Sequence, residues 1–421
     1  MCIKARRNDG DESIWPDERC QPPQERPSFP FAAQPPVCLR ILSIEDPYHR
    51  YFARRYNGSS LHHDRTGVLL LIYVNGRVLS QPLTGVQRFS RELLRELTLL
   101  RDDIVIAAPP DASDFGPLAS NVEIVGKRRG LAWEQLELPR FLRARKAPFL
   151  INLGNSAPVS YFNQLVVIHD IAFLKYPAGY GRTFRWWYTA LLPYLSHTAR
   201  KIATVSHFSR HEIAKAYRLD PVRIGVVYNA IGGDLTTPHG TEEGRSSDTF
   251  FTYASDSRLK NFDTVLAAFA KAREQVPIKL RCLSASEPHA GFIEALNTRF
   301  GEQTVVTLGR LDDNALSREY KKALGFVFVP YYAGFGLPPI EAQALDCPVL
   351  ASRAGALPEV MNDSALLSAP ESSTELADNM IALYQQRALA EKLTRLGREN
   401  ITRFSWRKSA EALNLMLPPG A

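Results

Sequence analysis

Short runs of apolar residues recur along most of the chain and alternate with stretches whose apolar residues return every three or four positions. The runs are rich in β-branched and aromatic residues, which is typical of strands buried on both faces of a parallel sheet. The intervening stretches, such as the one with Leu93, Leu94, Leu97 and Leu100, have the spacing of amphipathic helices. This alternation predicts an α/β protein in which ligands bind beyond the carboxyl ends of parallel strands. We expect strands at 68–74, 104–107, 122–125, 149–152, 165–168, 202–205, 224–229, 250–253, 279–283, 305–308, 326–329 and 349–351, and helices up to about 100 and at 131–145, 209–217, 261–273, 313–323, 374–384 and 388–404.

The same pattern divides the chain into four parts. Residues 1–67 are rich in proline and keep neither helical nor strand spacing, so we expect a disordered extension there. Residues 68–231 and 249–421 each carry the alternating pattern, and each is predicted to form a Rossmann-like domain, the second with closing helices. Residues 232–248 are polar and glycine-bearing, and we expect them to link the two domains, with a cleft between them.

Apolar runs and cysteines indicate the compartment. No run approaches the roughly 20 apolar residues of a membrane-spanning helix, and the first residues lack the apolar centre of a secretory signal. The five cysteines show neither a CxxC pair nor a Cys/His spacing, which argues against a zinc site and against a disulfide framework. We therefore expect a cytoplasmic protein, soluble or peripheral at the inner membrane face.

The net charge of +7 is spread unevenly. Residues 68–230 hold 21 Lys and Arg against 12 Asp and Glu, whereas residues 231–421 hold 20 against 23. A basic half points to nucleic acid, an anionic membrane surface or an anionic substrate. No nucleic-acid module is evident, so a membrane surface or an anionic substrate is favoured. The basic, aromatic stretch at 182–188 suits a membrane interface and equally suits a packed helix with a basic outer face.

A candidate anion site lies in the stretch 329–360. A predicted strand is followed by a glycine turn at 334–336 and then by two prolines, which suit the first turn of a helix. Free amides and the helix dipole at such a helix start favour an anion, and a glutamate one turn into the helix is placed to accept hydrogen bonds from sugar hydroxyls. The layout indicates a nucleotide-sugar diphosphate, although strand, glycine and helix also recur in α/β proteins without such a ligand. The residues concerned are Gly334, Phe335, Gly336, Leu337 and Glu341.

This stretch resembles the donor-binding signature of retaining family 4 glycosyltransferases, among them bacterial polysaccharide mannosyl- and rhamnosyltransferases. In that signature two glutamates, separated by seven residues, span the glycine turn, and a Gly-x-x-Pro-Glu element follows. Glu341 matches the second glutamate and residues 355–359 match the downstream element, but Ala333 stands where the first glutamate is expected. The resemblance covers about 68–421. It implies the GT-B fold of two Rossmann-like domains, with Glu341 on the ribose of the donor and the missing glutamate on the transferred sugar.

Two cationic residues follow the first strand of the second domain. Lysine and arginine can neutralise the charge that grows on a departing diphosphate without a metal ion. Lys260, followed by Asn261, resembles the Lys-Asn of the family, whose lysine grips the donor diphosphate, and Arg258 is a candidate substitute for the arginine usually found nearby. A charge at a helix start is otherwise usually solvated surface. No convincing Asp-x-Asp metal motif occurs, so we expect neither a metal nor another cofactor.

In the first domain, candidate residues lie at strand ends. Residues 84–88 resemble the glycine loop that faces donor and acceptor in the family, which makes Gly85 a donor-binding candidate, although the glycine can equally serve the turn alone. His169 and Asp170 end an apolar strand and match the His-Asp of the family, so both are catalytic candidates; a histidine there is otherwise a satisfied core residue. Ser206 and Ser209 resemble its Ser-x-x-Ser element, but we interpret them as a capping box that starts a helix at Ser209.

The sequence thus predicts a retaining glycosyltransferase that moves a hexosyl group, with mannosyl favoured, from a nucleotide-diphosphate sugar to a saccharide. The acceptor is expected to be lipid-linked, in surface polysaccharide biosynthesis. Because of Ala333, two alternatives stay open, a non-catalytic nucleotide-sugar binding subunit and a rhamnosyl- or other deoxyhexosyltransferase. A GT-B epimerase is disfavoured because the downstream motifs follow the transferase pattern.

Overall fold

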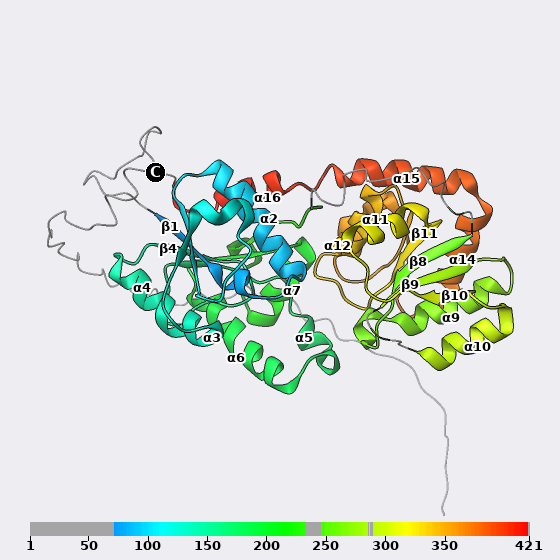
Figure 1. Cartoon of the computed structure of the whole chain (residues 1–421), viewed down its shortest axis with the longest axis horizontal. Helices are drawn as coiled ribbons and strands as arrows, with labels where there is room; N and C mark the ends of the chain where they lie inside the picture. Colours follow the sequence, from blue (N-terminus) through cyan, green and yellow to red (C-terminus); the bar gives the residue numbers. More distant parts are fainter. Residues whose placement is uncertain (1–70, 233–245, 247, 285, 287–288, 420–421) are drawn as a thin grey trace, which may run out of the picture. The chain divides into compact units, whose positions relative to one another are not determined.

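The computed structural model describes residues 71–232, 246, 248–284, 286 and 289–419. The expected extension, 1–67, and most of the expected linker lie outside the described residues. The described strands form two sheets in which every neighbouring pair is parallel, so the predicted pair of Rossmann-like folds is confirmed (Figure 1). The first sheet has the order β3-β2-β1-β4-β5-β6-β7 and the second β10-β9-β8-β11-β12-β13. Their bounds are β1 Ile72–Asn75, β2 Ile104–Ala108, β3 Val122–Ile124, β4 Phe149–Asn152, β5 Gln164–Val167, β6 Lys201–Thr204, β7 Ile224–Val226, β8 Thr249–Tyr253, β9 Lys279–Leu283, β10 Val305–Thr307, β11 Gly325–Phe328, β12 Val349–Ser352 and β13 Ala365–Ser368.

Both sheets reverse their strand order once. The reversal falls between β1 and β4 in the first sheet and between β8 and β11 in the second. At such a switch point the connections after the two neighbouring strands run to opposite faces of the sheet, which leaves a crevice beyond the carboxyl ends. The two segments singled out in the second domain, which follow β8 and β11, therefore start from adjacent strands.

Helices of amphipathic sequence cover the sheets, and most of the predicted ones are present. The structure adds β13, α5 (Ala172–Lys175), α10 (Ala290–Phe300), α13 (Leu357–Met361) and α16 (Trp406–Asn414), which the sequence pattern did not predict. The α-helices are α2 Gly85–Leu100, α3 Gly130–Ala132, α4 Leu138–Ala144, α5 Ala172–Lys175, α6 Arg182–Thr198, α7 His207–Tyr217, α9 Phe262–Arg273, α10 Ala290–Phe300, α11 Asp313–Lys322, α12 Leu337–Ala344, α13 Leu357–Met361, α14 Ser373–Gln385, α15 Arg387–Ile401 and α16 Trp406–Asn414. Short helices are η1 Gly76–Ser80, η2 Gly116–Asn121, η3 Trp133–Glu137, η4 Pro177–Gly179, η5 Pro221–Arg223, η6 Arg258–Lys260 and η7 Asn362–Ser364.

The helix predicted at 131–145 is interrupted. Its centre, η3, is a π-helix, which accommodates one residue more per hydrogen-bonded turn than an α-helix. The wider turn lets two successive residues face inward. The buried indole of Trp133 donates from Nε1 to the carbonyl of Val125 at 2.7 Å, and the buried Glu134 accepts from Asn75 Nδ2 at 2.8 Å.

The last helix returns to the first sheet. We expected 249–421 to form one domain, but α16 packs against α2 (Figure 1), with the ring of Trp406 5.8 Å from that of Phe89. Arg101, at the end of α2, donates from its guanidinium to Asn414 Oδ1 at 2.9 Å. The same guanidinium forms a buried pair with Asp103, at 2.6 Å between Nη2 and Oδ2. The C-terminal segment is therefore part of the first domain's packing.

Loss of this buried arginine is predicted to destabilise the fold. Arg101→Met leaves the carboxylate of Asp103 buried without its partner, which should lower the free energy of unfolding by about 3 kcal/mol or more. Denaturant unfolding of the full chain measures it. The matched control is Arg395→Met, in the exposed pair with Glu399, which should change stability by less than about 1 kcal/mol. Equal effects of the two variants would contradict the prediction.

Candidate functional site

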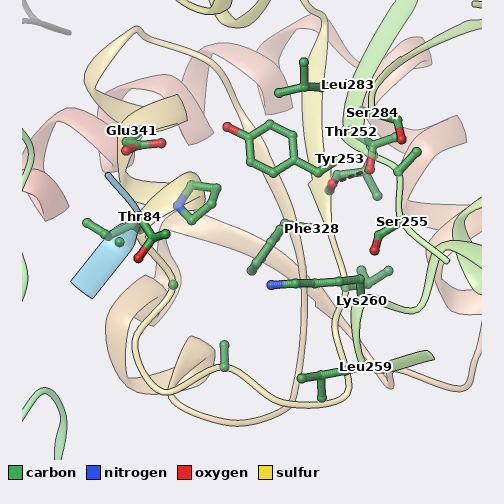
Figure 2. A pocket seen from close by; sticks show the side chains of 18 of the residues that line it. Thr84, Thr252, Tyr253, Ser255, Leu259, Lys260, Leu283, Ser284, Phe328 and Glu341 are labelled. Carbon is green, nitrogen blue, oxygen red and sulfur yellow. Dashed lines mark hydrogen bonds between the residues drawn. The ribbon is translucent and has the colours of Figure 1, made fainter. Parts of the chain in front are cut away.

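A cavity of about 860 Å³ lies at the switch point of the second sheet. Its volume falls within the range of small-ligand pockets. Residues that follow β8, β9, β10 and β11 line it, together with residues that follow β5 and residues at the start of α2. Figure 2 shows that Thr84, Lys260 and Glu341 reach it from three separate segments. Of the predicted site residues, the cavity brings together Gly85, Asp170, Lys260, Gly334, Gly336, Leu337 and Glu341.

Lys260 supplies a cation to this cavity. It ends η6, and the next residue, Asn261, takes the left-handed conformation with φ 59°, which asparagine tolerates better than most residues. The side-chain amide of Asn261 donates from Nδ2 to the carbonyl of Val329 at 2.8 Å, which fixes the turn against the end of β11. The side chain of Lys260 is exposed to the cavity, yet the surrounding protein displaces enough water to lower its pKa, against the opposing charge of Asp170. Lys260 thus places a partly desolvated ammonium group in the cavity.

Arg258, the other cationic candidate, lies outside the cavity lining. Successive residues of a 3₁₀-helix are about 120° apart around its axis, so Arg258 and Lys260 cannot both face the same side of η6. Arg258 is exposed. The prediction that both cations reach the donor site is therefore not supported by the structure.

The glycine turn after β11 is shaped by close contacts that only glycine permits. A Cβ at Gly334 would stand 2.8 Å from Cβ and from Oδ2 of Asp170, and a Cβ at Gly336, where φ is +107°, would stand 2.6 Å from Leu357. Gly336 is the N-cap position of α12, as the prolines predicted. Phe335 is not among the residues that line the cavity, and its buried ring packs 5.4 Å from that of Phe404.

Glu341 presents a buried carboxylate to the cavity. It lies one turn into α12 and is 9% exposed. Burial raises its pKa to about 7, with the guanidinium of Arg88 opposing the shift and the carboxylate of Asp313 adding to it. Within the described part of the chain, no donor is hydrogen-bonded to this carboxylate. Buried carboxylates without hydrogen bonds are costly, so a ligand that donates hydrogen bonds would be favoured here.

His169 and Asp170 separate at the end of β5. The buried His169 stands behind the cavity lining, where Nε2 lies 2.8 Å from the carbonyl of Leu153 and the ring packs edge-on against Phe89, 4.8 Å between centroids. Burial lowers the pKa of the imidazole, so it is neutral and donates from Nε2. Asp170 alone faces the cavity, and its Oδ1 accepts from the amide of Ala172 at 3.0 Å. The expected catalytic role of His169 is therefore not supported by its position.

The first domain contributes a charged residue, Arg88, that the sequence analysis did not single out as a site residue. Arg88 follows Gly85 by three residues on α2, so it lies on the same side of the helix and lines the cavity. Its Nη2 stands 3.5 Å from Oδ2 of Asp313 on α11, a helix of the second domain. The helical spacing from Gly85 was the signal in the sequence that would have indicated it.

Family models identify both domains. The model described as Glycosyltransferase Family 4 matches residues 83–232, and the model described as Glycosyl transferases group 1 matches residues 241–400. The first match covers β2 to β7 and the second covers β8 to β13, and together they cover well over half of the chain. The chain belongs to the glycosyltransferases. The resemblance inferred from the motifs around Glu341 is thereby confirmed at the level of the family.

Several sequence relatives of this glycosyltransferase are named mannosyltransferases, and others are named D-inositol 3-phosphate glycosyltransferases. It is 32% identical over 219 residues to the MMP alpha-(1->4)-mannosyltransferase of Mycolicibacterium hassiacum, a match over 50% of this chain and 52% of that protein. It is 25% identical over 319 residues to the O-antigen chain mannosyltransferase RfbU of Salmonella typhimurium, over 71% of this chain and 86% of that protein. The chain thus spans about half of the first relative and most of the second.

Solved structures confirm the GT-B fold of this glycosyltransferase. The glycosyltransferase WaaG, involved in lipopolysaccharide biosynthesis, aligns with a TM-score of 0.59 at 15% identity, over 82% of this chain and 98% of that chain. Anabaena Alr3699/HepE in complex with UDP and glucose aligns with a TM-score of 0.61 at 15% identity, over the same shares. At these identities the likeness concerns the fold alone.

The raised pKa of Glu341 predicts a stability difference that depends on pH. Its carboxyl has a pKa near 7 when folded against the usual 4.5, so the folded state holds more protons between these values and stability falls as pH rises through them. Glu341→Gln removes this loss. We expect the free energies of unfolding of the variant and of wild type to be equal near pH 4.5. As pH rises to 7, the variant should become more stable than wild type by about 3 kcal/mol, and this difference should not grow above pH 7.

Denaturant unfolding across this pH range measures the difference. Glu391→Gln is the control, because Glu391 is exposed in an ion pair on α15 and should show no such trend. A gain for Glu341→Gln that is independent of pH would contradict the assigned cause.

Proposed function

We propose that the cavity binds a nucleotide-diphosphate sugar between the glycine turn, Lys260 and Glu341. A single observation carries the proposal: an unpaired buried carboxylate and a cation share one cavity with the start of α12. The carboxylate of Glu341 would accept from the ribose hydroxyls. The ammonium of Lys260 would pair with the diphosphate, whose remaining oxygens would accept from the amides at the glycine turn.

The reaction we propose is transfer with retention at the anomeric carbon. The bond between that carbon and the diphosphate oxygen breaks with its electron pair leaving on the diphosphate, and a bond to the acceptor oxygen forms on the same face. The acceptor's proton passes to an oxygen of the departing diphosphate. Lys260 stabilises the charge that develops there. Asp170 lines the cavity so close to Gly334 that a Cβ there would collide with it. It is placed to accept from a sugar hydroxyl, and no step needs His169.

The sugar and the acceptor are proposed from the relatives. Two O-antigen chain mannosyltransferases match over most of their length, so we propose that a mannosyl group is transferred, from GDP-mannose, to a lipid-linked saccharide in surface polysaccharide synthesis. The neighbouring structures solved with UDP and UDP-glucose make uridine nucleotides the main competing donors. We further propose that neither a metal ion nor another cofactor is required.

We place the reaction at the cytoplasmic face of the membrane, as a peripheral contact. None of the described helices is both long and apolar enough to cross a bilayer. On α6, Trp186 is 72% exposed and stands among the exposed arginines 182 and 185. Tryptophan and arginine together suit an interface with anionic headgroups, which would bring the enzyme to a lipid-linked acceptor.

A donor panel tests the proposed function. Binding and turnover of GDP-, UDP- and dTDP-sugars, with a lipid-linked saccharide as acceptor, should be strongest for GDP-mannose and unchanged by EDTA. Lys260→Ala should weaken binding of donor and of nucleoside diphosphate alike, by about 1.5–3 kcal/mol for a lost charged hydrogen bond. The control is Lys279→Ala, whose lysine pairs with Asp248 on the surface. Undiminished nucleoside diphosphate affinity in Lys260→Ala would remove Lys260 from the site.

Ala333 motivates a second candidate, a binding subunit without transferase activity. It lines the cavity and offers no carboxylate to the sugar, whereas the proposed nucleotide contacts do not involve it. We favour an active enzyme, because Glu341 and Lys260 are both in place, and a deoxyhexosyl donor such as a rhamnosyl nucleotide is then a further possibility. Nucleoside diphosphate binding without transfer from any donor of the panel would establish the binding subunit instead.

Ala333→Glu should change sugar preference and leave nucleotide affinity alone. The backbone there is already held, since the amide of Ala356 donates to the carbonyl of Ala333 at 2.9 Å, so the new side chain need not displace the loop. We expect altered relative turnover of the donor sugars, with nucleoside diphosphate affinity unchanged within about twofold. Calorimetric titration and the donor panel measure both. A large loss of nucleoside diphosphate affinity would show that position 333 contacts the nucleotide.

A further inference from the structure

Two serines on the first domain hold a backbone carbonyl of the glycine turn in the second. Ser206 Oγ donates to the carbonyl of Gly334 at 2.6 Å, and Ser209 Oγ donates to the same oxygen at 3.0 Å. Both serines are fully buried. Ser206 is also the N-cap of α7, since its Oγ accepts from the amide of Ser209 at 3.0 Å. The helix start predicted at Ser209 thus lies earlier, at His207, and the serines do more than cap it.

A carboxylate of the second domain completes the junction. The amides of His207 and Phe208 donate to Oε1 and Oε2 of Glu359, each at 2.8 Å, where a carboxylate is favoured by the free amides of a helix start. The hydroxyl of Tyr228 donates to the same Oε1 at 2.8 Å. Glu359 ends the Gly-x-x-Pro-Glu element. The Ser-x-x-Ser element of the first domain thus meets this element and the glycine turn, both from the stretch 329–360, at the first turn of α7.

The bonded carbonyl fixes the direction of a peptide unit in the cavity wall. In a planar trans peptide the N–H of the next residue points opposite to the carbonyl. Holding the carbonyl of Gly334 toward α7 therefore turns the amide of Phe335 away from α7. Among the described residues no acceptor is hydrogen-bonded to that amide, while Gly334 itself lines the cavity. Glycine has a wide choice of backbone conformations, so without the two hydroxyls this peptide unit could rotate.

We propose that Ser206 and Ser209 are positioning residues, which set the glycine turn so that its free amides meet the phosphates of the donor. The inference rests on the proposed function of the cavity. In this arrangement the first domain completes the phosphate-binding geometry of the second domain, because it holds the carbonyl of Gly334. Nucleoside diphosphate affinity then depends on a contact that touches neither the nucleotide nor the sugar.

Ser209→Ala is the informative substitution, because it removes one bond to Gly334 and leaves the N-cap oxygen of Ser206 in place. Its matched control is Ser196→Ala. Ser196 is equally buried, lies on α6 of the same domain, and donates from Oγ to the backbone carbonyl of Leu192 at 2.6 Å. A purely structural role of Ser209 predicts similar losses of thermal stability in the two variants and no further difference between them.

Calorimetric titration with GDP and UDP, together with amide hydrogen exchange of the peptide covering 331–337, tests the proposal in the full chain. Ser209→Ala should weaken binding of whichever nucleoside diphosphate the wild type prefers by about three- to tenfold, as expected for one lost hydrogen bond. It should also speed exchange in 331–337. Ser196→Ala should do neither, and Ser209→Thr, which keeps the hydroxyl, should restore wild-type affinity.

The outcomes separate this inference from the proposed function. Wild-type affinity and exchange in Ser209→Ala would overturn the positioning role while the donor site stands. A wild type that binds no nucleoside diphosphate would overturn the donor site and this inference together. If Ser209→Thr fails to fold, the comparison of Ser209→Ala with Ser196→Ala still decides.

Discussion

The site depends on one constraint of parallel sheets, which is that neighbouring strands deliver their following loops to the same edge. Where the strand order reverses, between β8 and β11, the two connections part and leave a crevice. The segment after β8 carries Lys260, and the segment after β11 carries the glycine turn and Glu341. Residues about 80 positions apart in sequence thus form one cavity, because the strands before them are hydrogen-bonded neighbours.

The cavity wall also depends on the other sheet. Asp170 follows β5 and lies too close to Gly334 for a Cβ at that position. The two serines at the start of α7 hold the carbonyl of the same glycine. Arg88 reaches Asp313 from α2. These contacts, together with the return of α16 to α2, tie the two domains to each other around the glycine turn. A movement of one domain relative to the other would therefore change the conformation of the glycine turn at the candidate phosphate site.

Function and stability conflict at Glu341. A carboxylate that is buried and lacks a hydrogen bond is unfavourable in the folded protein, as its raised pKa indicates. A ligand that donates hydrogen bonds to this carboxylate would offset the cost, and such strained ionisable groups are typical of binding sites.

The sequence by itself determined the class of fold and much of the second domain's site. Apolar runs and helical spacing depend on local pattern, so most strands and helices, the glycine turn, and the start of α12 before Glu341 could be predicted from neighbouring residues. The family resemblance followed from the same short stretch. The prediction was less complete where spacing was ambiguous, as in the π-helix around Trp133 and in the unpredicted helix α16.

Only the tertiary structure decided which side chains face the cavity. Asp170 faces it and His169 does not, Lys260 lines it and Arg258 does not, although each pair lies within three residues. The junction of Ser209 with Gly334 joins residues 125 positions apart, and no local pattern contains it. The direction of a side chain at a strand end or on a short helix is fixed by what packs against it, and such contacts come from distant parts of the chain.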